Sequence, residues 1–448
     1  MKAIRKLYKS QNGYALPSVL MIASLITLLL FSLLTIISFN GFIASKKINK
    51  KKLELACVSA INKLLAEQRR PETADRITTE GSTTIRITVK QYGLFYQAKV
   101  TAGNSNDSAC AVFYLAEKCR KEFTNGLVIS DPNLQAAIAG TTLIDGNILS
   151  ATDNFTRGQI SEFPENGDIF HEGARDISDS LKVKLFFPLV DNRLYEPEDE
   201  SKPITISGTL NLTNAELSNW ASAEQIIIEG DLHINGKVIY PELFGLKILV
   251  NGNIIIEDNS EFNVPIEFDC KGNIEIGKNC LISACILLSE KDVKIDESKF
   301  NGVQIIAKEN IKVDDCLFNY PSFIKLDVVT ENKEEIDSKI EIINSVINGY
   351  ILLTNTTTGM SGNNSIIRID ESSRIQGLVY SENRLELHAP VYGVVYTYNF
   401  WNYVKPTEYI NWLINTHIMR DSLDFKFLMP IGFYKENDLE ILKTVWLY

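Results

Sequence analysis

An uncharged apolar segment near the start of this 448-residue chain constrains its fold more than any other feature. It runs from Gly13 to Phe39, between Lys9, the last charge before it, and Lys46, the first charge after it. As one helix, this segment could cross the ~30 Å hydrocarbon core of a bilayer, for which about 20 apolar residues suffice. The sequence therefore predicts a lipid bilayer as partner and a membrane tether for the rest of the chain.

Two other interpretations of this segment are weaker. A cleaved secretory signal has an apolar region of about 7–15 residues before a small-x-small cleavage site. The stretch from Tyr14 to Phe39 is well beyond that range. A helix buried in a soluble core is the other alternative, and an uncharged N-terminal segment of this length argues against it. We therefore favour a retained single-pass anchor, residues 14–70 including its extension.

The residues around the start of the segment add a family resemblance. Residues 1–13 form a basic leader whose last residue, Gly13, is followed at once by the aromatic Tyr14 and the apolar segment. This arrangement resembles the N-terminus of type IV prepilin-like proteins, the pilins and pseudopilins. The resemblance implies a prepilin peptidase that cuts between Gly13 and Tyr14 and methylates the new N-terminus. It also implies other pilin-like subunits as partners.

One position departs from the family pattern. The fifth residue after the cut is usually Glu in that family, and here it is Ser18. An unpaired carboxylate in lipid is costly unless its partner is present. A chain that lacks the carboxylate is poorly suited to ordinary filament positions, and some large minor pseudopilins at filament tips also lack it. The resemblance covers about the first 70 residues, and an ordinary uncleaved signal anchor remains the alternative.

Charge alone does not orient the anchor. Basic residues precede the segment, and five lysines follow it between Lys46 and Lys52, so the positive-inside rule gives no clear answer. The prepilin resemblance implies an N-terminus in the cytoplasm, a place in the cytoplasmic (inner) membrane, and a bulk that is extracytoplasmic.

The next segments predict a small α+β domain. Apolar residues between Ile48 and Leu65 recur at helical spacing, so residues 46–70 read as a continuation of the helix, which Pro71 ends. A break near Asn40 and Gly41 is the alternative. Residues 82–120 then form a β-meander, which resembles a small pilin head. Its three predicted strands are Thr83–Lys90, Leu94–Ala102 and Ala109–Ala116.

Residues 121–203 show no clear period. We expect a linker with irregular turns there, and the acidic run Glu196–Glu200 reads as a solvated connector rather than a metal site.

Self-similarity begins near Ile204. Each copy reads apolar, a short polar turn, then apolar-x-apolar, and the spacing of the turns shortens from 22 to 18 residues along the chain. The turn positions are Gly208, Gly230, Gly252, Gly272, Lys291 and Glu309. A repeat of about 20 residues is typical of a solenoid. Two strands per copy without a helix favour a parallel β-helix over residues 204–400, because stacked rungs share a core that one rung cannot bury.

The repeats resemble right-handed parallel β-helix and bactofilin-like repeats. A β-sandwich is the alternative, although its hairpin turns recur every 8–12 residues. Segments 325–338 and 354–364 break the period and are expected to bulge as loops. The aromatic-rich residues 401–448 are expected to cap the solenoid, or alternatively to form a surface that stacks sugars or docks a partner. The predicted fold class is mainly β: a transmembrane helix with an amphipathic extension, a small α+β pilin-like head, a parallel β-helix and a C-terminal cap.

The sequence offers little that points to catalysis. Four histidines, His171, His233, His388 and His417, are scattered without metal-type spacing, and phosphate-loop and nucleophile motifs are absent. Carboxylates on neighbouring turns, such as Asp296, Asp314 and Asp315, are expected by chance in a chain with 56 acidic residues. We therefore expect no enzyme, no catalytic residue, no cofactor and no metal. The net charge of −11 and the lack of a basic stripe argue against nucleic acid.

Seven cysteines cannot all pair. On one extended strand Cys110 and Cys119 would lie roughly 30 Å apart, too far for a disulfide unless the chain turns back. Cys270, Cys280, Cys285 and Cys316 are expected in different columns of the repeat, as small buried residues.

Three functions fit this organisation. We expect a membrane-anchored structural protein, a minor pilin-like or pseudopilin-like component of a type IV filament or a type II secretion-like machine. Its β-solenoid would serve adhesion or assembly. A surface-anchored β-helix protein that binds or modifies carbohydrate is one alternative, with polysaccharide as partner, and a self-polymerising bactofilin-like scaffold is the other.

Overall fold

A computed structural model describes residues 15–66, 74–105, 107–117, 125–152, 154–160, 170–172, 175–177, 203–240, 243, 245–328, 337–355, 364–422, 430 and 441–447. The chain divides into two compact units. The first contains residues 1–89, 98–113 and 445–447, and the second contains residues 90–97, 114–444 and 448.

A single long helix dominates the first unit. Helix α2 (Ala15–Ala66) has 52 residues and continues through Asn40 and Gly41, so the alternative of a break at that point is wrong. At 1.5 Å per residue its length is about 78 Å. The predicted extension of the membrane segment is confirmed as far as Ala66.

The four strands that follow α2 and the last described strand of the chain form one sheet, which includes an antiparallel hairpin. Its order is β1-β2-β3-β4-β37, and β1 pairs with β2 in antiparallel register. The three predicted strands are found within two residues of their expected ends, whereas β1 and β37 were not predicted. The bounds are β1 (Ala74–Glu80), β2 (Thr83–Tyr92), β3 (Phe95–Gly103), β4 (Ser108–Glu117) and β37 (Ile441–Leu447).

One face of the second half of α2 is buried, whereas the first half of the helix is exposed. Leu53, Cys57, Ile61 and Leu64 are at most 9% exposed and recur at three- and four-residue steps on one face. The thiol of Cys57 lies 3.6 Å from the carbonyl oxygen of Ala109, in β4. The amphipathic half of the helix therefore packs against strands of its own unit.

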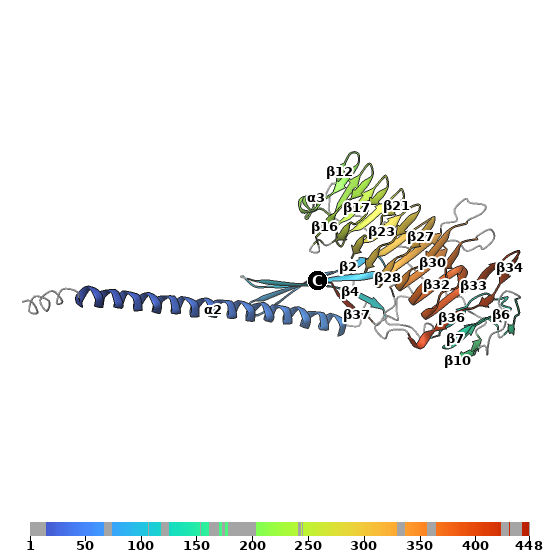
Figure 1. Cartoon of the computed structure of the whole chain (residues 1–448), viewed down its shortest axis with the longest axis horizontal. Coiled ribbons are helices and arrows are strands. Elements are labelled where there is room, and N and C mark those ends of the chain that lie inside the picture. The colour runs from blue at the N-terminus through green and yellow to red at the C-terminus, as the bar shows by residue number, and fades with distance from the viewer. Residues whose placement is uncertain are drawn as a thin grey trace, which may run out of the picture. The chain divides into compact units, whose positions relative to one another are not determined.

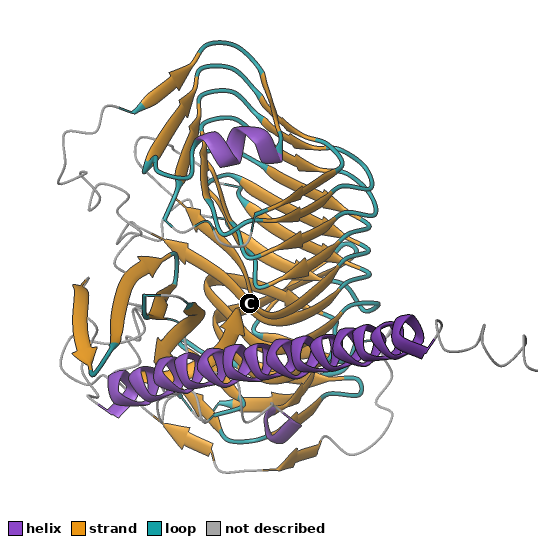
Figure 2. Cartoon of the chain, turned by 90° about the vertical axis from the view of Figure 1, so that its left-hand side faces the viewer, coloured by secondary structure: helices purple, strands orange, loops and turns teal. Residues whose placement is uncertain are grey.

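The second unit is a parallel β-solenoid. Its strands form three ladders, in which each strand pairs in parallel with the strands of the rungs before and after it (Figures 1 and 2). This arrangement confirms the predicted parallel solenoid and excludes the β-sandwich alternative. The predicted turn positions also stack, since the backbone nitrogen of Gly252 bonds to Gly230 and that of Gly272 bonds to Gly252.

Each ladder is defined by its strands. The first ladder contains β12 (Ile204–Ile206), β14 (Gln225–Ile228), β17 (Lys247–Val250), β20 (Glu267–Cys270), β23 (Ile286–Ser289) and β26 (Gln304–Ala307). The second contains β13 (Leu210–Leu212), β15 (Leu232–Ile234), β18 (Ile254–Ile256), β21 (Ile274–Ile276), β24 (Val293–Asp296), β27 (Asn310–Asp314), β29 (Lys339–Ile343) and β31 (Ile366–Ile369). The third begins with β16 (Lys237–Ile239), β19 (Glu261–Asn263), β22 (Leu281–Ser283) and β25 (Lys299–Asn301).

Later rungs use long strands that turn corners and so belong to two ladders or, in β32 and β33, to all three. These are β28 (Leu317–Val328), β30 (Val346–Asn355), β32 (Arg374–Leu387) and β33 (Val391–Val404). The predicted loop 325–338 therefore starts too early, because Lys325–Val328 lie in β28. The predicted loop 354–364 likewise overlaps the end of β30. The remainders of both loops, residues 329–336 and 356–363, lie outside the described residues.

The ladders do not end with the predicted repeat region. Strand β33 pairs with β5 (Leu127–Ile129), which pairs with β8 (Ile148–Ser150) and then β11 (Arg175–Ile177). Strand β36 (His417–Met419) pairs with β33, with β7 (Leu143–Asp145) and through it with β10 (Phe170–Glu172). Figure 1 shows β7 and β10 beside β36.

Two sequence-based boundaries are therefore corrected. The described part of residues 121–203 supplies rungs of the solenoid rather than a linker. A third sheet joins β35 (Trp412–Ile414), β6 (Ala136–Ala139) and β9 (Phe155–Arg157). Residues 401–419 are not the terminal layer, because β36 has a strand on each side. The acidic run Glu196–Glu200 lies outside the described residues.

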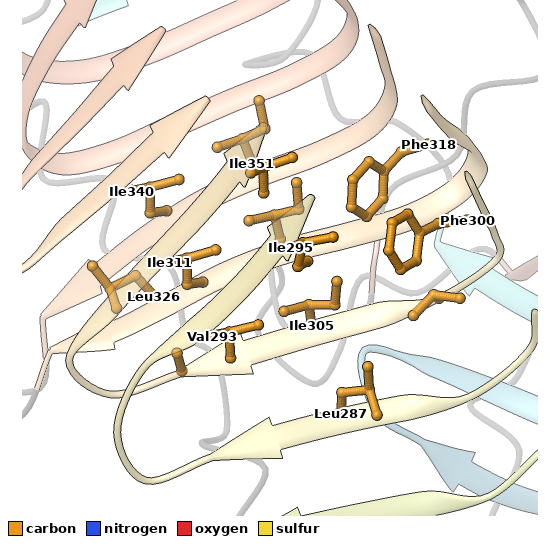
Figure 3. Close-up of a cluster of buried hydrophobic side chains, with 14 of the residues drawn as sticks. Leu287, Val293, Ile295, Phe300, Ile305, Ile311, Phe318, Leu326, Ile340 and Ile351 are labelled. Carbon is orange, nitrogen blue, oxygen red and sulfur yellow. The ribbon is translucent and has the colours of Figure 1, made fainter. Parts of the chain in front are cut away.

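Alternation along each strand builds the interior core. Val293, Ile311 and Ile340 follow one another in the second ladder, and each is buried (Figure 3). In the third ladder the rings of Phe300 and Phe318 stack at 4.3 Å between centroids. Stacking like on like lets every rung bury the same apolar face on the next one.

The corner between the first and second ladders carries a column of amides and carboxylates. Its members are Asp231, Asn253, Asn273, Asp292 and Asn310. Asp231 Oδ1 accepts from the backbone nitrogen of Asn253 at 2.7 Å, and Asn253 Oδ1 accepts from that of Asn273 at 2.9 Å. These bonds satisfy turn backbone that the ladders leave unpaired.

Helix α3 (Asn214–Asn219) closes the first rung in place of a third-ladder strand. Leu217 and Trp220 are buried in the solenoid core, and Asn214 Oδ1 accepts from the backbone nitrogen of Ile239 at 2.9 Å. The backbone nitrogen of Thr213 donates to the carboxylate of Glu216 at 3.1 Å, as expected at the start of a helix.

The second unit also contains residues 90–97, the tip of the β2–β3 hairpin. Phe95 is buried, and its ring centroid lies 5.4 Å from that of Phe323. The amide of buried Gln304 bonds on both sides, accepting from the nitrogen of Leu94 at 2.8 Å and donating to the carbonyl of Tyr92 at 3.0 Å. The tip therefore covers apolar residues on the outer face of the first ladder.

Candidate functional site

The residues predicted for prepilin processing lie at the start of α2. Gly13 and Tyr14 are outside the described residues, and Ser18 is exposed near the N-terminal end of the helix. The predicted cut between Gly13 and Tyr14 is therefore not tested.

The first half of α2 exposes an apolar surface all round the helix. Large apolar side chains from Leu16 to Phe42 are between 52% and 73% exposed. The helix is long and apolar enough to cross a membrane, and none of its apolar window is buried within the protein. Its internal hydroxyls are satisfied, since Thr27 and Thr35 donate to the backbone carbonyls of Ala23 and Phe31, at 2.7 and 2.8 Å. This surface suits a hydrocarbon environment.

The carboxylates considered for catalysis do lie together. Asp296 and Asp314 are direct partners on neighbouring rungs, as predicted. Asp296 lies 3.4 Å from the ammonium of Lys278, and Asp314 lies 3.5 Å from that of Lys312. Asp315 accepts a bond from the amide of Asn344 at 3.2 Å. These groups form half-exposed ion pairs along a regular surface, which is how solvated rungs satisfy their charges.

The histidines remain apart. His233 lies 3.3 Å from Glu257, His388 lies 3.3 Å from Glu386, and His417 contacts the carbonyl oxygen of Thr141 at 2.6 Å. No group of three metal-ligating side chains occurs among the residues that the structure describes.

The buried cysteines correct one prediction. Cys280 and Cys316 occupy the same corner of the third ladder, on either side of Ser298, although the sequence suggested different columns. Their backbone nitrogens donate to the hydroxyls of Ser298 and Ser345, each at 2.9 Å. Burial raises the pKa of Cys270 to about 11 and that of Cys316 to about 12, so both are inert thiols. Cys119 lies outside the described residues.

One cluster of buried charged side chains was missed by sequence reasoning. The Lys325 cluster consists of Lys325, Asp327, Thr354, Tyr380 and Glu382 on three successive rungs. The side chain of Lys325 is 2% exposed and its ammonium lies 3.3 Å from Asp327. The hydroxyl of Thr354 donates to Asp327 at 2.8 Å, and that of Tyr380 donates to Glu382 at 3.0 Å.

Burial governs the electrostatics of this cluster. Desolvation raises the pKa of the Glu382 carboxyl, while bonds from the backbone of Asn355 and from Tyr380 oppose the rise. Burial also raises the pKa of Tyr396 to about 12, with a contribution from the charge of Glu382. The ring of Tyr396 stacks on Tyr380 at 4.6 Å between centroids. The bonds of Thr354 to Asp327 and of Asn355 to Glu382 join three neighbouring rungs.

A signal for this cluster was present in the sequence. Lys325 and Asp327 alternate with the core residues Ile324, Leu326 and Val328, a strand pattern inside a segment that we predicted as a loop. The pattern does not reveal that the outward face of this strand is buried.

Comparison with known proteins identified no relative. No protein-family model matches the chain, and the searches of curated proteins and of solved structures gave no match.

Proposed function

We propose that this chain is a membrane-anchored extracytoplasmic structural protein, a minor pilin-like subunit that carries a β-solenoid. The observation that carries the proposal is the division of one continuous helix into two halves. Its first half exposes apolar side chains throughout, and its second half buries Leu53, Cys57 and Ile61 against strands of the same unit. A helix built in this way joins a bilayer to a folded domain.

The absence of a carboxylate at Ser18 supports a minor rather than a repeating subunit. The exposed helical turns around Ser18, which would face lipid, contain no acidic side chain that could pair with the amino terminus of a neighbouring helix. A subunit at the tip of a filament needs only one neighbour below it, and its solenoid would stand at the distal end. The supported role is therefore one of shape and position, adhesion or assembly, in the cytoplasmic membrane and on its outer side.

N-terminal mass spectrometry tests this proposal. The full chain is expressed in cells with and without a prepilin peptidase, and the N-terminal peptide is sequenced. We expect a methylated N-terminus at Tyr14 only when the peptidase is present. Replacing Gly13 by a bulky residue (G13L) should block the cut and leave membrane association unchanged.

Recovery of an intact leader in both strains would refute the pilin-like role. It would leave an uncleaved anchor as the explanation of the apolar half of α2. Cleavage at a site beyond Phe39 would instead identify a secretory signal and remove the anchor altogether.

A further inference from the structure

The last part of β33 leaves one row of outward side chains that the fold does not use. Phe400 and Asn402 point inward and are at most 2% exposed, so Asn399, Trp401 and Tyr403 alternate with them on the outer face. The described hairpin partner β34 (Thr407–Ile410) pairs with this segment in antiparallel register.

The two rings of this row are nearly parallel. Their planes differ by 10° and their centroids are 6.4 Å apart. Tyr403 is 51% exposed, and Ile410, opposite Trp401 on β34, is 52% exposed. Trp401 itself is half-buried. Aromatic side chains usually bury most of their surface, so an exposed ring beside a half-buried one points to a ligand.

Two polar atoms of the same row lack partners. Oδ1 of Asn399 and Nε1 of Trp401 are both buried without a hydrogen bond in the part of the chain that the structure describes. An orphaned buried donor or acceptor costs about 1–3 kcal/mol, so native proteins seldom leave two side by side. One atom is an acceptor and the other is a donor, which is the pair that a hydroxyl group satisfies.

Charged groups with opposite signs border the row. The guanidinium of Arg368 lies 5.5 Å from the Trp401 ring centroid, and its Nε lies 3.0 Å from the carboxylate of Glu386. His388 lies 3.3 Å from the other oxygen of Glu386. These groups offer donors and acceptors beside the rings, and because they neutralise one another they do not select a strongly charged ligand.

We propose that Asn399, Trp401, Tyr403, Arg368, Glu386 and His388 form a binding site for a neutral pyranose glycan. The C–H faces of a pyranose pack on the aromatic rings, and its vicinal hydroxyls reach the carboxylate, guanidinium and imidazole beside them. A hydroxyl also supplies the partner that Asn399 and Trp401 lack once the Trp401 ring turns toward solvent. The site does not depend on the anchor or on processing of the leader.

Affinity electrophoresis of the full chain in a detergent without a sugar head group tests the proposal. The probes are a mixed-linkage β-glucan, a galactomannan and glycol chitin, with polygalacturonate and heparin as acidic counterparts. We expect at least one neutral polysaccharide to retard the wild-type protein. Replacing Trp401 or Tyr403 by alanine should weaken that binding by about tenfold, because each ring supplies a large apolar contact.

A matched control lies on the same strand. Tyr392, also in β33, has the guanidinium of Arg374 at 4.3 Å from its ring centroid, outside the proposed site. The Tyr392→Ala variant should bind within twofold of the wild type. Y403A changes an exposed ring and so keeps the test valid if W401A unfolds, which the melting temperature reports.

Three results would overturn the proposal. The first is that no neutral polysaccharide retards the protein, and the second is that only the acidic polymers do. The third is that Y403A binds a neutral polysaccharide as well as the wild type does.

Discussion

Charged side chains without access to water need ion-pair or hydrogen-bond partners within the fold, and the Lys325 cluster shows how this solenoid supplies them. Lys325 faces Asp327, and Glu382 takes bonds from Tyr380 and from the backbone of Asn355. Removing one partner from such a cluster leaves an uncompensated buried charge. Glu382 differs, because burial already raises its pKa, and so neutralising it removes the free-energy cost of burying its charge.

The pH dependence of stability follows from the raised pKa of Glu382. Below pH 4.5, its usual value, the carboxyl is protonated in folded and unfolded chains alike. Above it the unfolded chain releases the proton first, so stability falls as pH rises through the folded pKa. The Glu382→Gln variant cannot ionise. We expect its free energy of unfolding to exceed that of the wild type increasingly as pH rises from 4.5 through the folded pKa, by about 1.4 kcal/mol per unit of raised pKa.

Urea denaturation of the full chain at several pH values measures this difference. Glu290→Gln is the matched control, because the side chain of Glu290 is 49% exposed in its pair with Lys308. A constant difference between E382Q and wild type over the range would contradict the account.

At the scale of elements, the corner between the first and second ladders limits how closely rungs stack. A Cβ on Gly252 would lie 2.3 Å from Asp231 Oδ1 and 2.7 Å from the carbonyl oxygen of Gly230. Two rungs later the equivalent position is Lys291, which is exposed. The shorter later rungs thus admit a side chain where the earlier ones require glycine.

The Gly252→Ala variant should therefore lose about 1–3 kcal/mol of stability through overpacking against the preceding rung. Lys291→Ala should change stability by no more than about 0.5 kcal/mol. Thermal unfolding followed by circular dichroism compares the two. Equal melting temperatures for G252A and K291A would show that the corner is not closely packed.

The elements that could be predicted are those whose own sequence carries the signal. The rungs from Ile204 onward repeat one another, so their ladder follows from period alone. Strands β5, β6 and β7 have no such signal, because they are three or four residues long and pair with strands some 270 residues later in the chain. Strands β8 and β9 in turn pair with β5 and β6. Helix α3 did carry one, the capping pair Thr213 and Glu216, but six residues are too few to show a period.

The candidate sites were predictable to different degrees. The outward placement of the Trp401 and Tyr403 rings depends on which side of β33 faces away from the core, and alternation gives that side only once the inward position of Phe400 is known. The Lys325 cluster needs three rungs in register, which a single strand's sequence does not specify. The long apolar helix needed no tertiary information.

At the scale of the whole molecule, chain order and ladder order differ. The described chain enters the solenoid at residues 125–177, which form its last rungs, and reaches the first rung at Ile204. The ladder between β12 and β11 spans about twelve steps of ~4.8 Å, roughly 58 Å. Residues 178–203 can span about 86 Å when extended, which suffices to join the two ends.

The solenoid and the apolar half of α2 differ in the solvent that suits them. Ladder bonds and corner side chains satisfy backbone groups of the solenoid, whereas the first half of α2 leaves side chains from Leu16 to Phe42 without cover in its own unit. Water is a poor solvent for a surface of that size, and a bilayer is a good one. Whether the chain is held at a membrane therefore depends on where that half of the helix resides.

Membrane partition of the full chain and of a chain that lacks residues 1–45 measures this most directly. We expect the full chain to sediment with membranes and to resist alkaline carbonate, and the shortened chain to be soluble, with part of the helical circular dichroism signal lost and the β contribution retained. A full chain found in the soluble fraction, or a shortened chain still held by membranes, would contradict the account.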